Sequence, residues 1–121
     1  MRVPRWTLLV PVALAGCAES PAMPRTALPG SPSVELVETT VQPGYVRLEW
    51  QVTNAPGDSL LLQRRHDDDP WKFRAWLAPD ASGRMVFEDS AVTPGEPYSW
   101  RVRLAGHEPE YQGAVTLTVP Q

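Results

Sequence analysis

The octapeptide PYSWRVRL occupies residues 97–104, and every second side chain in it is large and apolar. The side chains between them are polar or cationic. A period of two residues places alternate side chains on opposite faces of a β-strand, so this stretch predicts a strand with one face buried. Residues 46–52, VRLEWQV, show the same alternation and predict a second strand of the same kind.

The rest of the chain after residue 32 follows this pattern in shorter pieces. Turn-forming clusters of proline, glycine and asparagine separate the pieces, and no helical periodicity joins them. The pattern predicts an all-β fold of seven short strands, arranged as an antiparallel sandwich with one face of each sheet buried. The five further strands are expected within residues 34–36, 60–65, 71–77, 85–87 and 115–119.

Length and composition exclude several classes of protein. The chain has 121 residues, which sets a ceiling of one small domain. Its 14 prolines recur along the whole length and argue against a helical bundle. One cysteine cannot form an intrachain disulfide, and a net charge of −3 argues against nucleic-acid binding by bulk charge.

The N-terminus, MRVPRWTLLVPVALAGC, has the three-part layout of a secretory signal. Two arginines precede an apolar run over residues 6–15, and small residues follow the run. Ten residues rise only about 15 Å as a helix, roughly half of a bilayer core, so the run is too short for a stable membrane span.

Residues 14–17, Leu-Ala-Gly-Cys, resemble the lipobox of bacterial lipoproteins. The resemblance implies removal of residues 1–16 as the signal peptide and a covalent diacylglyceryl lipid on Cys17, which anchors the protein in the membrane of the cell envelope. Ala18 stands where an Asp usually signals inner-membrane retention, so the resemblance implies the outer membrane if the source is Gram-negative. The alternative is an ordinary signal peptide with an unpaired thiol.

Residues 17–32 then comprise the lipidated cysteine and a proline-rich linker, with four prolines among residues 18–32. This segment is expected to be disordered and partly extended, and to lift the domain off the membrane. The folded domain is expected over residues 33–121.

Within that domain, the segment Val46-Arg47-Leu48-Glu49-Trp50 resembles the second strand of a fibronectin type III domain. Residues 87–102, FEDSAVTPGEPYSWRV, resemble the family's longest signature, with Tyr98 at the tyrosine-corner position. The resemblance implies a seven-stranded immunoglobulin-like sandwich, a hydrogen bond from the Tyr98 hydroxyl to backbone at the start of the turn, and core positions for Trp50, Trp71 and Trp100.

Catalytic and cofactor sites are not expected. The resemblance places His66 and His107 in loops at opposite poles, and no nucleophile elbow or phosphate loop is present. The adjacent residues Asp67, Asp68 and Asp69 are expected to form a solvated hairpin tip. A weak calcium site shared with Asp89 or Glu96 is the alternative.

Strand alternation turns several cations outward on the third, fourth and sixth strands, and the resemblance implies that these three strands share one sheet, so a set of cations is expected on one sheet face. If Leu60 and Leu62 face the core, Leu61, Gln63 and Arg65 face outward. Such a face would bind an anionic partner, either an acidic protein patch or a charged envelope polysaccharide, unless neighbouring charges balance it. The five expected cations are Arg65, Lys72, Arg74, Arg101 and Arg103.

Trp76 breaks the alternation that Trp71 and Phe73 begin. It is therefore expected either on the surface, as a sugar platform or contact anchor, or turned inward by a bulge. The sequence as a whole predicts a non-catalytic, lipid-anchored module for protein interaction in the envelope. The alternatives are a carbohydrate-binding module that uses Trp76, or an accessory subunit that pairs through an edge strand.

Overall fold

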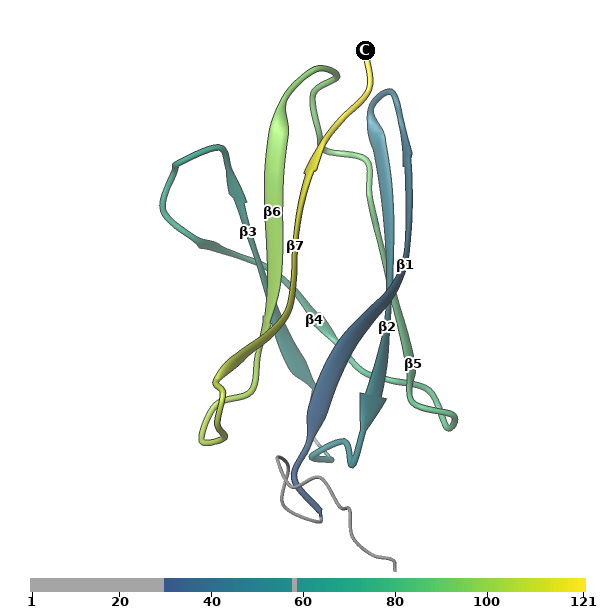
Figure 1. The fold of residues 1–121 in the computed structure, drawn as a ribbon, viewed down its shortest axis with the longest axis vertical. Coiled ribbons are helices and arrows are strands. Elements are labelled where there is room, and N and C mark those ends of the chain that lie inside the picture. The colour runs from purple at the N-terminus through teal and green to yellow at the C-terminus, as the bar shows by residue number, and fades with distance from the viewer. Residues whose placement is uncertain (1–29, 58) are drawn as a thin grey trace, which may run out of the picture.

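A computed structural model describes residues 30–57 and 59–121, which form a β-sandwich of seven antiparallel strands (Figure 1). The seven predicted strands are all present, and most are longer than the alternation suggested. The strands are β1 (Ser33–Gln42), β2 (Tyr45–Thr53), β3 (Leu60–His66), β4 (Lys72–Leu77), β5 (Arg84–Asp89), β6 (Pro97–Arg103) and β7 (Tyr111–Thr118).

Two sheets face each other. One has three strands in the order β1-β2-β5, and the other has four in the order β4-β3-β6-β7. The start of β1 lies at the same pole as the loops that join β2 to β3, β4 to β5 and β6 to β7 (Figure 1). The β3–β4 turn and the C-terminus lie toward the opposite pole. His66 and His107 are therefore far apart, as expected.

The core lies between the sheets around two fully buried tryptophans, Trp50 on β2 and Trp100 on β6. The alternate residues predicted to face inward on these strands are all buried, which confirms the alternation there. The indole Nε1 of Trp50 donates to the carbonyl oxygen of Gly113 on β7 at 2.9 Å. This bond satisfies the buried indole N–H and joins β2 to the opposite sheet.

A bulge in β4 changes the side on which its residues lie. Leu62 of β3 is opposite Ala75, and the next residue, Gln63, is opposite Phe73, so Arg74 is the extra residue. Phe73 consequently lies on the outer face of the sheet rather than on the core side. The prediction of a core position for Trp71 is wrong: this residue precedes β4 and is half-buried outside the core.

The corner between β5 and β6 is fixed by Tyr98. Its hydroxyl oxygen accepts a hydrogen bond from the backbone N–H of Thr93 at 2.9 Å, while its ring is buried. The predicted bond from this hydroxyl to backbone is thereby confirmed.

The predictions for the N-terminus lie largely outside the described residues. These include the signal peptide 1–16, Cys17 and the linker up to residue 29. The end of the expected linker packs on the domain, because Pro32 is buried and the Ser31 carbonyl accepts from Asn54 Nδ2 at 3.2 Å. In residues 30–57 and 59–121, no helix is long and apolar enough to cross a membrane.

We expect Gly113→Ala to destabilise the fold by about 1–3 kcal/mol, as overpacked core positions do. A Cβ at residue 113 would lie 2.8 Å from the Trp50 ring, which is enclosed by the core. Gly44→Ala is the matched control, because Gly44 shares a positive φ but has open space around it. Urea unfolding of both variants measures the difference, and equal losses would show that backbone strain, not the contact with Trp50, governs the effect.

Candidate interaction surface

Three of the five predicted cations lie where the alternation places them. Arg65 is on the outer side of β3, and Arg101 and Arg103 are on the outer side of β6, opposite Gln63 and Leu61. Directly opposed residues of antiparallel strands share a face. The outer side of the four-stranded sheet therefore carries a row of arginines.

The predicted outward orientation of the other two cations is wrong. The bulge turns Arg74 toward the inside of the sandwich, where its guanidinium binds Asp89. Lys72 is directly opposite Arg64, and the Arg64 guanidinium binds Asp89 inside the sandwich. Because directly opposed residues share a face, Lys72 also lies on the inner side of the sheet. It is exposed there because β4 is an edge strand. The alternation missed both because it assumed an unbroken period of two through β4.

Asp89, at the end of β5, has no exposed side-chain surface. Its carboxylate accepts hydrogen bonds from Arg64 Nη1 at 3.0 Å, from Arg74 Nη2 at 3.0 Å and from Trp100 Nε1 at 3.2 Å. The backbone N–H of Ala91 adds a further bond at 3.0 Å. This group, here termed the Asp89 clasp, joins β5 of one sheet to β3, β4 and β6 of the other.

The clasp holds its carboxylate ionised. Burial alone would raise the pKa of Asp89, but the hydrogen bonds from Arg74, Ala91 and Trp100 and the charge of Arg64 outweigh that effect. The net result is a pKa below its ordinary value of 3.8.

On the outer side of the four-stranded sheet, aromatic rings and arginines alternate in space. Arg101 lies between two rings, with its guanidinium carbon 4.2 Å from the centroid of Trp71 and 3.6 Å from that of Tyr111. Arg65 covers the same Trp71 ring at 4.8 Å. We call this surface the aromatic–arginine face, and its members are Leu61, Gln63, Arg65, Trp71, Phe73, Trp76, Arg101, Arg103 and Tyr111.

Three large apolar side chains of this face are open to solvent. Trp76 is 62% exposed, Phe73 is 59% exposed and Tyr111 is 40% exposed. The rings of Phe73 and Trp76 are neighbours, with centroids 5.9 Å apart and planes tilted by 54°. The surface alternative for Trp76 is thus the correct one, and the bulge brings Phe73 beside it instead of turning Trp76 inward.

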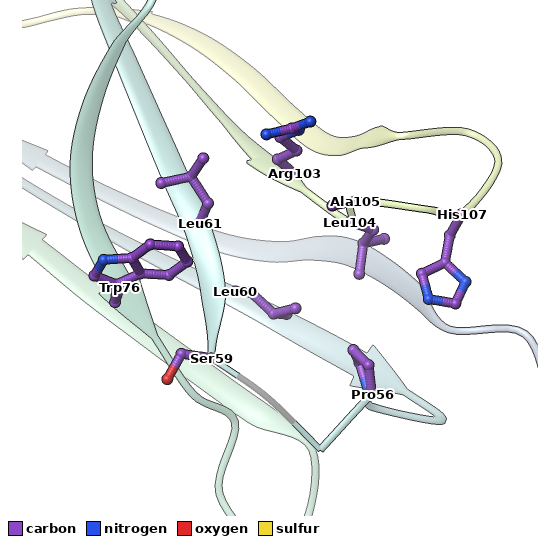
Figure 2. Close-up of a pocket in the computed structure, with 9 residues that line it drawn as sticks. All are labelled: Pro56, Ser59, Leu60, Leu61, Trp76, Arg103, Leu104, Ala105 and His107. Carbon is purple, nitrogen blue, oxygen red and sulfur yellow. The ribbon is translucent and has the colours of Figure 1, made fainter.

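A cavity of about 200 Å³ opens at the end of this face that lies beside the β2–β3 loop, with Pro56, and the β6–β7 loop, with His107 (Figure 2). Trp76 borders one side and His107 the other, and Arg103 lies at the rim (Figure 2). Glu110 hydrogen-bonds the Arg103 guanidinium and raises the pKa of Arg103. The apolar part of the lining comes from Pro56, Leu60, Leu61, Leu104 and Ala105.

The acidic tip at residues 67–69 is exposed at the β3–β4 turn. Glu96 of the neighbouring corner contacts His66 Nε2 at 2.8 Å, and Asp89 is engaged by two arginines. Both carboxylates proposed to complete a calcium site are therefore already paired. Within residues 30–57 and 59–121, no group of three or more acidic, histidine or cysteine side chains is placed to hold a metal ion.

Two elements of the surface were not expected from the sequence. One is the cavity, which combines residues from three separate segments without a local motif. The other is Trp71, whose ring faces outward between Arg65 and Arg101. Arginines near Trp71 in the predicted sheet could have indicated that a guanidinium packs against its ring. The assignment of Trp71 to the core excluded that interpretation.

Comparison with protein-family models finds no match, and a search of curated proteins finds no relative.

We expect Asp89→Asn to lower the free energy of unfolding by about 3 kcal/mol. The substitution removes the negative charge that compensates Arg64 and Arg74 while preserving side-chain size. Asp68→Asn, at the exposed hairpin tip, is the control and should change stability by less than about 0.5 kcal/mol. Urea unfolding at pH 7 is the measurement. If Asp89→Asn leaves the free energy of unfolding nearly unchanged, the two guanidiniums need no buried counter-charge.

The lowered pKa of Asp89 sets a pH dependence. A carboxyl group whose pKa is lower in the folded than in the unfolded state stabilises the fold above the unfolded-state pKa of about 3.9, and this contribution is lost as the pH falls through the folded-state pKa. As the pH is lowered below about 4, we expect the free energy of unfolding of the wild-type protein to decrease. The decrease should be less steep in Asp89→Asn. Parallel pH profiles for the two proteins would contradict this assignment.

Proposed function

We propose that this chain is a bacterial lipoprotein that displays one fibronectin type III-like module for non-catalytic protein interaction in the cell envelope. The lipobox-like residues 14–17 behind an apolar run support the anchor. The strand order β1-β2-β5 facing β4-β3-β6-β7, together with the Tyr98 corner, supports the assignment to the fibronectin type III class of immunoglobulin-like sandwiches.

The exposed aromatic–arginine face carries the interaction proposal. Trp, Tyr and Arg are the residues that dominate binding energy at protein interfaces, especially where they lie together near a pocket. Trp76 and Phe73 expose most of their surface to water, although both are large and apolar. The Arg101 guanidinium already contacts two rings and donates a hydrogen bond to Gln63, so little side-chain entropy remains to be lost on binding.

The anchor would give this face a defined position. The start of β1 lies at the pole that carries the cavity beside Trp76, so this pole would be the one nearer the membrane (Figure 1). The acidic tip at residues 67–69 would point away. Tethering raises the local concentration of a weak binding domain near partners in the same envelope, so a modest interface would suffice.

A carbohydrate-binding module is the second candidate, favoured by the exposure of Trp76 beside a cavity with polar rim groups. A sugar ring packs against one flat aromatic surface. The 54° tilt between Phe73 and Trp76 gives an angular ridge rather than a continuous platform, which favours a protein partner.

We expect Cys17→Ser to abolish lipid attachment and to move the protein from the membrane to the soluble fraction. The matched control is Ala18→Ser, the neighbouring position. Metabolic labelling with a fatty-acid analogue, followed by membrane fractionation, measures both outcomes. Labelling that persists in Cys17→Ser would exclude the proposed anchor.

We expect Trp76→Ala to weaken capture of a protein partner by about tenfold or more, because it removes an exposed aromatic anchor. Charge reversal of Arg101 and Arg103 together should do the same. Val86→Ala is the control, since Val86 is an exposed apolar residue of the other sheet. The measurement is cross-linking in native cells followed by tagged pulldown and mass spectrometry, with urea unfolding of each variant to verify the fold.

Partner capture that is unchanged in Trp76→Ala and in the double charge reversal would exclude the aromatic–arginine face as the interface. Retention on envelope polysaccharide that depends on Trp76, with no protein captured, would establish the carbohydrate-binding alternative instead.

A further inference from the structure

A second cavity lies within the β3–β4 hairpin, near its turn. Its volume is about 150 Å³. We call it the hairpin cavity. Three of the five cations predicted to bind an anionic partner line it, together with a fourth cation that was not predicted. Its charged or titratable lining residues are Arg64, Arg65, His66, Asp69, Lys72 and Arg74.

Positive charge exceeds negative charge around the hairpin cavity. The four cations face one lining carboxylate, Asp69, whose side chain is 61% exposed. Asp89, behind the lining, compensates Arg64 and Arg74 jointly with a single negative charge. Two positive charges therefore remain uncompensated by these carboxylates. Like charges held close together repel one another, and a bound anion would relieve this repulsion.

The guanidiniums are held in place with donors to spare. The described hydrogen bonds use only Nη1 of Arg64 and only Nε and Nη2 of Arg74, which leaves Nη2 of Arg64 and Nη1 of Arg74 for another acceptor. Arg64 also packs over the Tyr98 ring at 5.2 Å, and Arg74 over the Phe87 ring at 5.0 Å. Donors fixed in this way lose little entropy when an anion binds.

Arg65 gives an independent indication. Its Nε is buried and has no hydrogen-bond partner among the described residues. A buried polar atom without a partner is uncommon in folded proteins and often marks the place of a bound water or ion. This atom belongs to a side chain that lines the hairpin cavity.

We propose that the hairpin cavity binds a multivalent oxyanion, phosphate or sulfate, as a free ion or as an ester. Guanidinium groups bind such anions through several N–H donors at once, and the lysine ammonium adds a compact charge. A volume of about 150 Å³ is well above the roughly 10–15 Å³ that one water needs on the same measure, so the cavity has room for one tetrahedral anion. The site shares Arg65 and Phe73 with the aromatic–arginine face, but it uses neither Cys17 nor Trp76 and does not require the proposed anchor.

The test is titration calorimetry of the purified full-length protein with inorganic phosphate at pH 7 and constant ionic strength, paired with the thermal midpoint of unfolding in phosphate and in chloride. We expect binding of phosphate and a higher midpoint in phosphate. Lys72→Met should weaken phosphate binding by about tenfold or more, since it removes a charge-assisted hydrogen bond. Arg103→Met is the matched control: it also removes one positive charge, but outside this cavity, and should change affinity by less than about twofold.

Acetate and glycerol 1-phosphate distinguish the ligands. Weak binding of acetate together with tight binding of inorganic phosphate and glycerol 1-phosphate supports a site for multivalent oxyanions. Tighter binding of glycerol 1-phosphate than of inorganic phosphate would show that the preferred ligand is an ester and not the free ion. The proposal is overturned if phosphate neither titrates nor raises the midpoint above chloride. It is also overturned if Arg103→Met weakens binding as much as Lys72→Met, because the effect would then come from overall charge.

Discussion

The rest of the structure depends on one buried carboxylate. Asp89 lies at the end of β5 in the three-stranded sheet, and its hydrogen-bonding partners come from β3, β4 and β6 of the other sheet. Arg64 and Arg74 both point into the sandwich, where charges without a counter-ion would be costly. The negative charge of the Asp89 carboxylate offsets the cost of placing these two guanidiniums inside the sandwich. It thereby fixes β4, an edge strand that the core covers only in part, against β5.

The position of β4 determines both candidate surfaces. Because Arg74 is taken up as an extra residue on the inner side, Phe73 and Trp76 both lie on the outside, 5.9 Å apart. The same bulge brings Arg74 beside Arg64 at the hairpin cavity. Of the predicted cations, Arg101 and Arg103 thus lie on the aromatic outer face, Lys72 and Arg74 line the basic cavity at the hairpin, and Arg65 belongs to both. Two kinds of ligand can then be proposed for one small domain.

Sequence periodicity predicted β2 and β6 well, because the core-facing residues of both strands alternate without interruption. It failed at β4 for a specific reason: one extra residue reverses the side on which every preceding residue lies. That reversal misplaced Lys72 and Phe73, and Arg74 was misplaced because it is the extra residue itself, whereas Arg101 and Arg103 on the regular strand β6 were not. Apolar size was a second source of error, since Trp71 looked like a core residue but packs against Arg65 and Arg101.

The sequence by itself determined the all-β class, the number of strands and the inward residues of the regular strands. These follow from local patterning, which requires only that apolar side chains leave water. The tertiary structure alone decided that Asp89 meets two arginines, that Trp76 borders a cavity and that four cations share another. Each of these depends on residues brought together from separate strands, and the bulge in β4 changes which of its residues face which side. Contacts between residues far apart in the chain produce no periodic pattern in the sequence, so local patterning cannot predict them.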